Sequence, residues 1–131
     1  IYNLEIKLQE FLVRDTEDYL RWCLKKGKRF DCIILDPPSF SRHDGHVFSI
    51  QKKLPRLIEM AIESLAPQGQ VLIATNCSSI STRQLKEYAM DKVQKLKYRV
   101  KQVESLHQAR DFTESGTMKE SHLAALLVFL N

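Results

Sequence analysis

Apolar and polar positions follow two different periods along the chain. Short runs of consecutive apolar residues predict strands buried in a sheet. Between these runs, apolar residues recur every three or four positions, which is typical of amphipathic helices. The expected strands are residues 11–13, 30–35, 71–75, 98–106 and 123–130, and the expected helices are about 16–26, 54–65 and 82–96.

Residue types at the ends of these segments support the division. Asp15 or Thr16 is suited to cap the first helix, and Gly27 is suited to end it. Pro55 is expected in the first turn of the second helix, where its missing N–H costs no hydrogen bond. Residues 36–49 predict a polar loop, and residues 67–69 (Pro-Gln-Gly) predict a turn. The third helix is expected to begin at Ser81 or Thr82.

The order of elements predicts an α/β fold. Strands that alternate with helices favour a parallel sheet with right-handed crossovers. The strand at 30–35 is so apolar that we expect helices on both of its faces. Only a polar loop, 107–121, joins the last two strands, so we expect them to be antiparallel. The predicted sheet is mostly parallel with a C-terminal antiparallel strand.

Composition fits one ordinary globular unit and excludes several classes. The chain has 131 residues, of which 44% are hydrophobic, and no apolar run approaches the roughly 20 residues of a membrane span. No secretory pattern begins the chain, so a cytoplasmic location is expected. The cysteines are three, widely spaced and without a CxxC motif, which favours neither disulfides nor zinc. The four histidines show no ligand spacing, and structural roles are expected for them.

Charge alone leaves the choice of partner open. The formal net charge is +4, and basic residues cluster at 25–29 and along 92–101. A solvated surface explains such clusters, and so does a patch that contacts phosphates.

Candidate chemistry lies where two neighbouring strands end. Asp36-Pro37-Pro38-Ser39-Phe40 follows one strand, and residues 76–79 (Asn-Cys-Ser-Ser) follow the next. Ligands of open α/β sheets bind outside the carboxyl ends of the strands, so both segments should face one crevice. The prolines give a rigid turn with outward carbonyl acceptors, and beside Phe40 they suit a planar group with N–H donors. A Pro-Pro turn with a core phenylalanine explains the same residues without function.

Residues 30–40, FDCIILDPPSF, resemble the fourth motif of class I S-adenosylmethionine-dependent methyltransferases. Specifically, they resemble the family of bacterial 23S rRNA cytosine-C5 methyltransferases and their guanine-methylating relatives. The match continues through Val47-Phe48, the helix at 54–65 and LIATNCS at 72–78, and Gln108, Ala109 and Asp111 resemble a late loop of the family. The resemblance implies S-adenosyl-L-methionine as cofactor and rRNA as substrate.

The resemblance also implies roles for single residues. The family's nucleophile falls on Cys77, whose thiolate would attack carbon 6 of cytosine so that carbon 5 accepts the methyl group. Asp36, with Pro37 and Pro38, would orient the base or contact the cofactor, and Phe40 would stack on the base. Asp15 falls where the family's third motif places an acidic residue near the adenosine. Without the resemblance, Cys77 is better explained as a small buried side chain, which is the usual role of a free cysteine, and Cys23 and Cys32 are expected in the core.

The family's Gly-rich cofactor turn has no counterpart here, because the chain contains four glycines and no GxG. We therefore expect residues 1–131 to be the C-terminal portion of a methyltransferase catalytic domain that lacks the first strands. Two other interpretations stay open. One is a nucleobase N-methyltransferase that uses the Asp-Pro-Pro-Phe loop and needs no cysteine, and the other is a non-catalytic RNA-binding module.

Overall fold

The computed structural model describes residues 12–38, 40–43, 46–106 and 123–131. Its main sheet has four strands in the order β1-β4-β6-β5. They are β1 (Phe30–Leu35), β4 (Leu65–Thr75), β5 (Val100–Leu106) and β6 (Ala124–Leu130). β1 pairs parallel with β4, whereas β6 lies between β4 and β5 and is antiparallel to both. The mixed α/β sheet with a C-terminal antiparallel strand is therefore confirmed, and that strand lies inside the sheet rather than at its edge.

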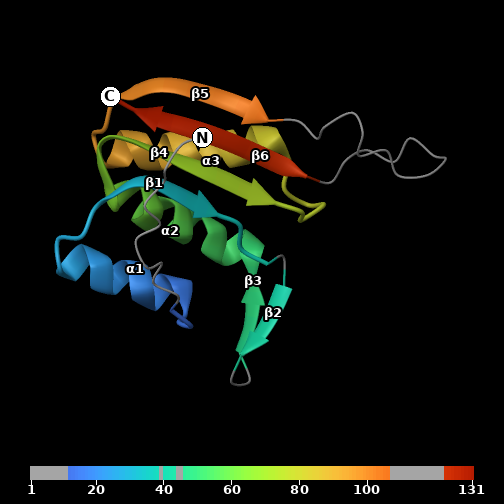
Figure 1. Cartoon of the computed structure of the whole chain (residues 1–131). Coiled ribbons are helices and arrows are strands. Elements are labelled where there is room, and N and C mark those ends of the chain that lie inside the picture. Colours follow the sequence, from blue (N-terminus) through green and yellow to red (C-terminus); the bar gives the residue numbers. More distant parts are fainter. Residues whose placement is uncertain (1–11, 39, 44–45, 107–122) are drawn as a thin grey trace, which may run out of the picture.

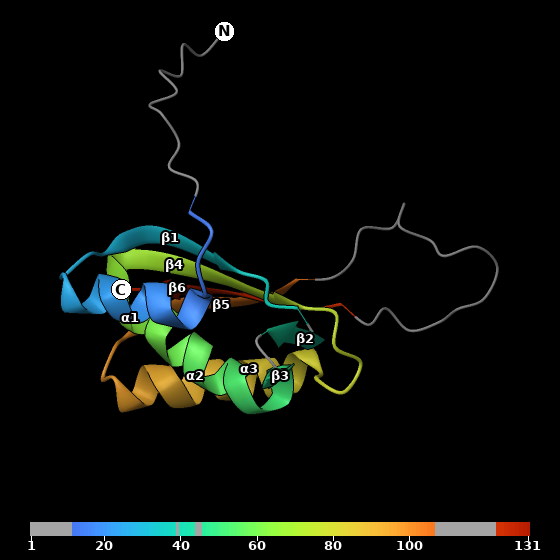
Figure 2. The same ribbon diagram turned by 90° about the horizontal axis from the view of Figure 1, so that it is seen from below.

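Three helices cover one face of this sheet: α1 (Thr16–Lys25), α2 (Ile50–Glu63) and α3 (Thr82–Lys95). All three lie on the same side of the sheet (Figure 2). α2 is the central helix and contributes the largest share of the core, since its apolar residues recur at helical spacing. It packs against alternate side chains of the strands, namely Leu35, Val71, Ile73, Leu126 and Val128.

The expected helix ends at α1 and α3 are confirmed. The Asp15 carboxylate accepts a hydrogen bond from the Asp18 amide at 3.1 Å, which satisfies one free donor of the first turn of α1. Gly27 follows α1 at φ +67°, where a glycine has no steric cost. Ser81 caps α3 in a capping box with Gln84.

Other expectations are corrected by the structure. Residues 12 and 13 form no strand, and Phe11 is outside the described residues. α2 begins four residues before Leu54, so Pro55 lies inside the helix and removes the donor to the Gln51 carbonyl. The polar loop after Pro38 contains an antiparallel hairpin, β2 (Phe40–His43) and β3 (His46–Ser49), which its polar sequence concealed (Figure 1).

β1 forms as expected but is buried on only one face. Cys32 is exposed rather than in the core, and Ile34 is 70% exposed. The reason is the single helical layer, because Cys32 and Ile34 alternate along β1 with Ile33 and Leu35, which pack into the core under the helices. The expected turn at 67–69 is a bulge inside β4, where the partners of Phe30 and Cys32 on β4 are Leu65 and Gln70.

Candidate active site

The first part of the site is the start of α1. Asp15 has an extended backbone, with φ −61° and ψ 131°, and its carbonyl accepts from the Tyr19 amide at 3.0 Å. The capping bond fixes the orientation of its carboxylate. Since the side chain is exposed, the carboxylate lies at the surface in a fixed position beside the helix N-terminus.

The second part is the turn that follows β1. Asp36 and Pro38 are exposed, and Pro37 between them is buried. A buried proline with a fixed φ anchors the turn, so its neighbours are presented toward solvent in one conformation. Ser39 is outside the described residues, and so is the side chain of Phe40, whose stacking role stays a prediction.

A cavity of about 440 Å³ joins these two parts. This volume lies within the roughly 300–1,000 Å³ of small-molecule sites. Carboxylates, two basic side chains and an apolar wall surround it, so it can accept amino or hydroxyl donors beside a flat apolar group. It is lined by Arg14, Asp15, Thr16, Glu17, Ile34, Leu35, Asp36, Pro37, Pro38, Lys53 and Leu57. The predicted residues Asp15, Asp36, Pro37 and Pro38 are thus brought together.

Cys77 follows β4 at the same sheet edge as the cavity, but it does not line the cavity. Leu35 pairs with Ile73, so the segments after β1 and β4 leave the sheet at the same edge, as expected. Cys77 itself is half-buried and packs against the core. Its amide donates to the Thr75 hydroxyl at 3.2 Å, which turns the chain away from the strand. The crevice shared by both segments is therefore confirmed only as a shared sheet edge.

A hydrogen-bonded pair from outside the predicted set holds the Cys77 thiol. Cys77 Sγ lies 3.1 Å from Ser79 Oγ, and Gln51 Nε2 donates to that same hydroxyl oxygen at 2.5 Å. Because Ser79 Oγ accepts from the amide, its own hydrogen is available to the sulfur. No sequence signal marks Gln51, since residue 51 falls between the expected loop at 36–49 and the expected helix at 54–65.

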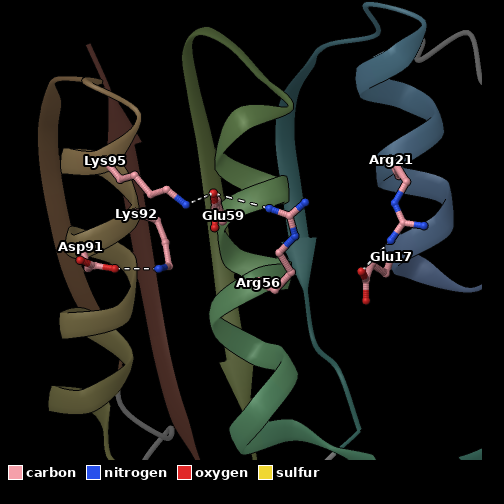
Figure 3. Close-up of polar contacts among 7 residues, drawn as sticks. All are labelled: Glu17, Arg21, Arg56, Glu59, Asp91, Lys92 and Lys95. Carbon is pink, nitrogen blue, oxygen red and sulfur yellow. Dashed lines mark hydrogen bonds and ion pairs between the residues drawn. The ribbon is translucent and has the colours of Figure 1, made fainter.

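A cluster of charged side chains lies away from the cavity, between α2 and α3 (Figure 3). Glu59 accepts from Lys95 Nζ at 2.6 Å, and Arg56 Nη1 lies 3.5 Å from the same oxygen. The Lys95 hydrogen bond, and then the charges of Lys95 and Arg56, lower the pKa of the Glu59 carboxyl although burial opposes this. None of these three residues lines the cavity, so the cluster is structural.

Much of the basic surface is likewise engaged in local contacts. Lys28 Nζ lies 4.6 Å from the centre of the Trp22 ring, and Tyr19 stacks on the same ring. Lys92 Nζ lies 2.7 Å from Asp91. At Lys28 and Lys92, contacts within the protein account for the basic side chains. A contact of the two basic clusters with RNA phosphates stays a prediction.

Neither a metal site nor a membrane-spanning helix is found in the described part of the chain. There, no group of three or more potential ligand side chains could hold a metal ion. Among the same residues, no helix is long and apolar enough to cross a membrane. His107, His122, Gln108, Ala109 and Asp111 lie outside the described residues.

The relatives of this chain are named as methyltransferases, and a solved relative shares its fold. No family model matches the chain. YwbD of Bacillus subtilis (strain 168), provisionally named as a ribosomal RNA large subunit methyltransferase, is 33% identical over 88 residues, covering 67% of this chain and 22% of YwbD. Ribosomal RNA large subunit methyltransferase K of Neisseria meningitidis serogroup B is 30% identical over 112 residues, covering 84% of this chain and 29% of that protein.

A solved structure extends the likeness to three dimensions. The crystal structure of SMU.776, assigned as a methyltransferase and complexed with SAH, superposes with a TM-score of 0.70 at 28% identity. The match covers 89% of this chain and 30% of that one. The fold is therefore the Rossmann-like fold of methyltransferases, as expected. The chain spans less than a third of each relative's length, and the relatives' names specify neither cytosine nor carbon 5.

Proposed function

We propose that this chain is the C-terminal portion of the catalytic domain of an S-adenosylmethionine-dependent methyltransferase that modifies a nucleobase of large-subunit rRNA. One observation carries the proposal. A single cavity at the carboxyl end of β1 unites Asp15 with Asp36, Pro37 and Pro38, in a chain similar to rRNA methyltransferases. An rRNA substrate also agrees with the expected cytoplasmic location.

The cavity fits part of the cofactor. The Asp15 carboxylate is fixed by its capping bond and is suited to accept from the amino or hydroxyl groups of the adenosine. Ile34 and Leu57 offer apolar contacts to a flat ring. No Gly-rich turn is available in the sequence for the methionine end, so that half of the site would come from elsewhere in a longer protein. When bound, the cofactor supplies an electrophilic methyl group.

The turn after β1 would bind the target base. Asp36 and the carbonyl of Pro37 are acceptors, and they suit the exocyclic amino group of an extruded cytosine or guanine. Pro38 and Phe40 would give the base an apolar contact. Because the turn is held by the buried Pro37, little order would have to be created on binding.

For the acceptor atom we propose carbon 5 of cytosine, with Cys77 as nucleophile. Addition of the thiolate to carbon 6 raises the electron density on carbon 5, which then accepts the methyl group. A base removes the carbon 5 proton, the electron pair of that bond reforms the ring double bond, and the Sγ–C6 bond breaks. The Ser79 hydroxyl, held by Gln51, would orient the sulfur.

A specific observation favours a second candidate, methylation of a base nitrogen. Cys77 packs partly against the core and does not line the cavity, whereas the Asp-Pro-Pro turn does. In that chemistry the Asp36 carboxylate would accept a hydrogen bond from the amino group that is methylated, and Cys77 would have no chemical role.

The two candidates are separated by one substitution in a longer protein that carries the complete cofactor site. Under the cysteine mechanism, Cys77→Ala abolishes transfer of labelled methyl groups to unmodified rRNA, and RNA containing 5-fluorocytosine stays covalently attached to the unsubstituted enzyme. Ser105→Ala, which removes an exposed hydroxyl group on β5 outside the cavity, is the control and keeps full activity.

The other outcomes of these experiments support one of the two remaining interpretations. Full activity of Cys77→Ala together with loss of activity in Asp36→Ala supports nitrogen methylation. If the complete protein binds rRNA with steep salt dependence but transfers no methyl group to it, the chain is a non-catalytic RNA-binding module and the proposal is wrong.

A further inference from the structure

A small cavity, here called the far pocket, lies at the end of the sheet opposite the candidate active site. Its volume is about 220 Å³, and it is lined by Gln68, Lys101, Phe129, Leu130 and Asn131. β4 and β5 begin beside it and β6 ends there, at the end of the sheet that carries the label C in Figure 1. Since β1 has six residues, about 20 Å of strand separates this end from the turn at Asp36.

The far pocket offers hydrogen-bonding groups beside an apolar surface. Gln68 and Asn131 carry amide groups, which both donate and accept, and Lys101 supplies a positive charge. Phe129 and Leu130 supply the apolar part of the lining. The volume is below the roughly 300 Å³ at which sites for whole small molecules begin. The pocket therefore suits one base or sugar of a ligand whose remainder lies outside it.

Residues 97–101, Lys-Tyr-Arg-Val-Lys and here called the basic segment, run beside the far pocket. The backbone amide of Asn131 donates to the carbonyl of Arg99 at 2.9 Å, which joins the segment to the pocket lining. The segment carries three positive charges and no acidic side chain. Within the described residues no carboxylate pairs with these charges, whereas Lys92 and Lys95 in the preceding helix each have an acidic partner. The basic segment is therefore available to an anionic ligand.

The backbone at this end adopts a conformation that usually selects glycine. Among the described residues other than glycine, only Gln68 and Lys97 have a positive φ, of 63° and 59°. α1 ends with the same pattern of hydrogen bonds as α3, but Gly27 holds the equivalent position there, at φ +67°. A side chain in this conformation costs energy that glycine avoids, and such strain persists mainly at functional sites. The retention of an amide and a positive charge here favours a ligand that uses them.

The dipole of α3 accounts for only part of this positive charge. It favours cations in the last turn of the helix and falls off within that turn. It therefore explains Lys95 but not Arg99 or Lys101, which follow the helix. Tyr98 is 38% exposed beside them, so a planar group can stack on its ring. Basic side chains next to an exposed aromatic ring are typical of surfaces that bind single-stranded nucleic acid.

We propose that the far pocket and the basic segment bind a single-stranded stretch of RNA outside the candidate active site. The basic side chains of the segment would contact phosphates, Tyr98 would stack on one base, and the far pocket would hold the neighbouring base or its ribose beside Phe129. This contact would position the RNA and add affinity without taking part in methyl transfer. The choice of RNA as partner rests on the proposed function, whereas the anion-binding character of the surface does not.

The salt dependence of RNA binding provides a direct test. The protein is purified in the form that its cells produce and titrated into fluorescent oligouridine of about ten nucleotides, a length typical of single-strand sites. Arg99→Gln combined with Lys101→Gln should weaken binding at least about fivefold. The slope of log affinity against log salt should fall by about 1.4, since each lost phosphate contact removes roughly 0.7.

The matched control is Arg21→Gln combined with Arg83→Gln. It removes as many positive charges, but from arginines that already pair with carboxylates of their own helices. Affinity and salt slope should stay close to those of the original protein. Equal effects of the two pairs of substitutions mean that only net charge matters, and the proposal is wrong.

Tyr98 and Lys97 separate RNA binding from folding. Tyr98→Ala should weaken RNA binding about fivefold or more, as the loss of one stacked base does, whereas Tyr98→Phe keeps the ring and should not. Lys97→Gly relieves the positive φ, so the urea midpoint should stay or rise while RNA affinity falls. Unchanged RNA affinity of Tyr98→Ala or of Lys97→Gly overturns the proposal.

Methyl transfer by a longer protein with the complete cofactor site distinguishes this inference from the proposed function. Arg99→Gln combined with Lys101→Gln should raise KM for unmodified rRNA and leave kcat unchanged, because the contact lies away from the reacting atoms. RNA binding that depends on the basic segment, without any methyl transfer, rejects only the proposed function. Methyl transfer with an unchanged KM rejects only this inference. If free uridine monophosphate competes as strongly as oligouridine, a free nucleotide fills the far pocket and the proposal is wrong.

Discussion

The ammonium group of Lys95 lies 2.6 Å from Oε1 of Glu59, and this contact joins α3 to α2 (Figure 3). The Glu59 side chain is only 11% exposed, and the Lys95 side chain is 59% exposed. A largely buried carboxylate is thus compensated by a lysine that stays in contact with water. Because Arg56 also approaches Glu59, removal of the negative charge leaves two basic side chains without their shared partner.

Glu59→Gln should lower the free energy of unfolding by about 1 kcal/mol at neutral pH, the upper range for partly exposed ion pairs. The Lys95 hydrogen bond lowers the folded-state pKa of Glu59 below its ordinary value of 4.5. The carboxylate therefore stabilises the fold above that value, and this contribution is lost as the pH falls through the folded-state pKa. Urea unfolding at several pH values should show the variant approaching the original protein in acid.

The matched control is Glu87→Gln on α3. Glu87 pairs with Arg83 at 3.1 Å, but both side chains are mostly exposed. The control should change stability by less than about 0.5 kcal/mol. Equal effects of the two substitutions would mean that burial of Glu59 adds nothing.

Asp15 has two roles that substitution can separate. Asparagine caps a helix about as well as aspartate, so Asp15→Asn should keep stability within about 0.5 kcal/mol, whereas Asp15→Ala should cost about 1 kcal/mol. If the carboxylate also binds the cofactor, both variants of a complete enzyme should weaken S-adenosylmethionine binding in calorimetry. Ser81→Ala is the control, since it removes the cap of α3, which is outside the cavity. It should lose stability but not affinity; unchanged affinity of Asp15→Asn would contradict the cofactor role.

The sequence predicts most of the fold because its elements carry local signals. Asp15, Gly27 and Ser81 mark helix ends through hydrogen bonds and backbone conformations that involve only neighbouring residues. The hairpin of β2 and β3 was missed, since only Phe40, Val47 and Phe48 among its eight strand residues are apolar and they do not alternate regularly with polar residues. The predicted burial of Cys32 was wrong for another reason. An apolar strand indicates that both faces of the sheet are covered, but not whether the same chain supplies both covering layers.

The candidate site was predicted in part for a related reason. Asp36 and Pro37 form a local motif, and its position at a strand end follows from the order of elements. That Asp15 would share their cavity depends on how α1 packs against α2 near the end of β1, which the resemblance indicated but spacing did not. Gln51 was not found, because its contact with Ser79 joins residues 28 positions apart.

The 131-residue chain alone should bind S-adenosylmethionine weakly or not at all. Its cavity offers Asp15 and apolar walls, but the sequence holds no Gly-rich turn for the methionine end. Isothermal calorimetry should detect no binding at micromolar cofactor, while a longer protein with the complete site should bind. Micromolar affinity of the short chain would show that the described cavity suffices.

The last prediction concerns Gly69, which sets the register of β1 against β4. A Cβ atom at this position would lie 2.8 Å from the Ala66 carbonyl oxygen and 3.1 Å from that of Phe30. Since both neighbours are backbone atoms, they cannot move aside without shifting the bulge. Gly69→Ala should therefore cost about 1–3 kcal/mol, as overpacking does. The control is Gly27→Asn, because nothing lies within 4 Å of a Cβ there and asparagine tolerates a positive φ. Urea unfolding should show a clearly smaller loss for the control, and equal losses would mean that the close approach at Gly69 costs no more than the positive φ at position 27.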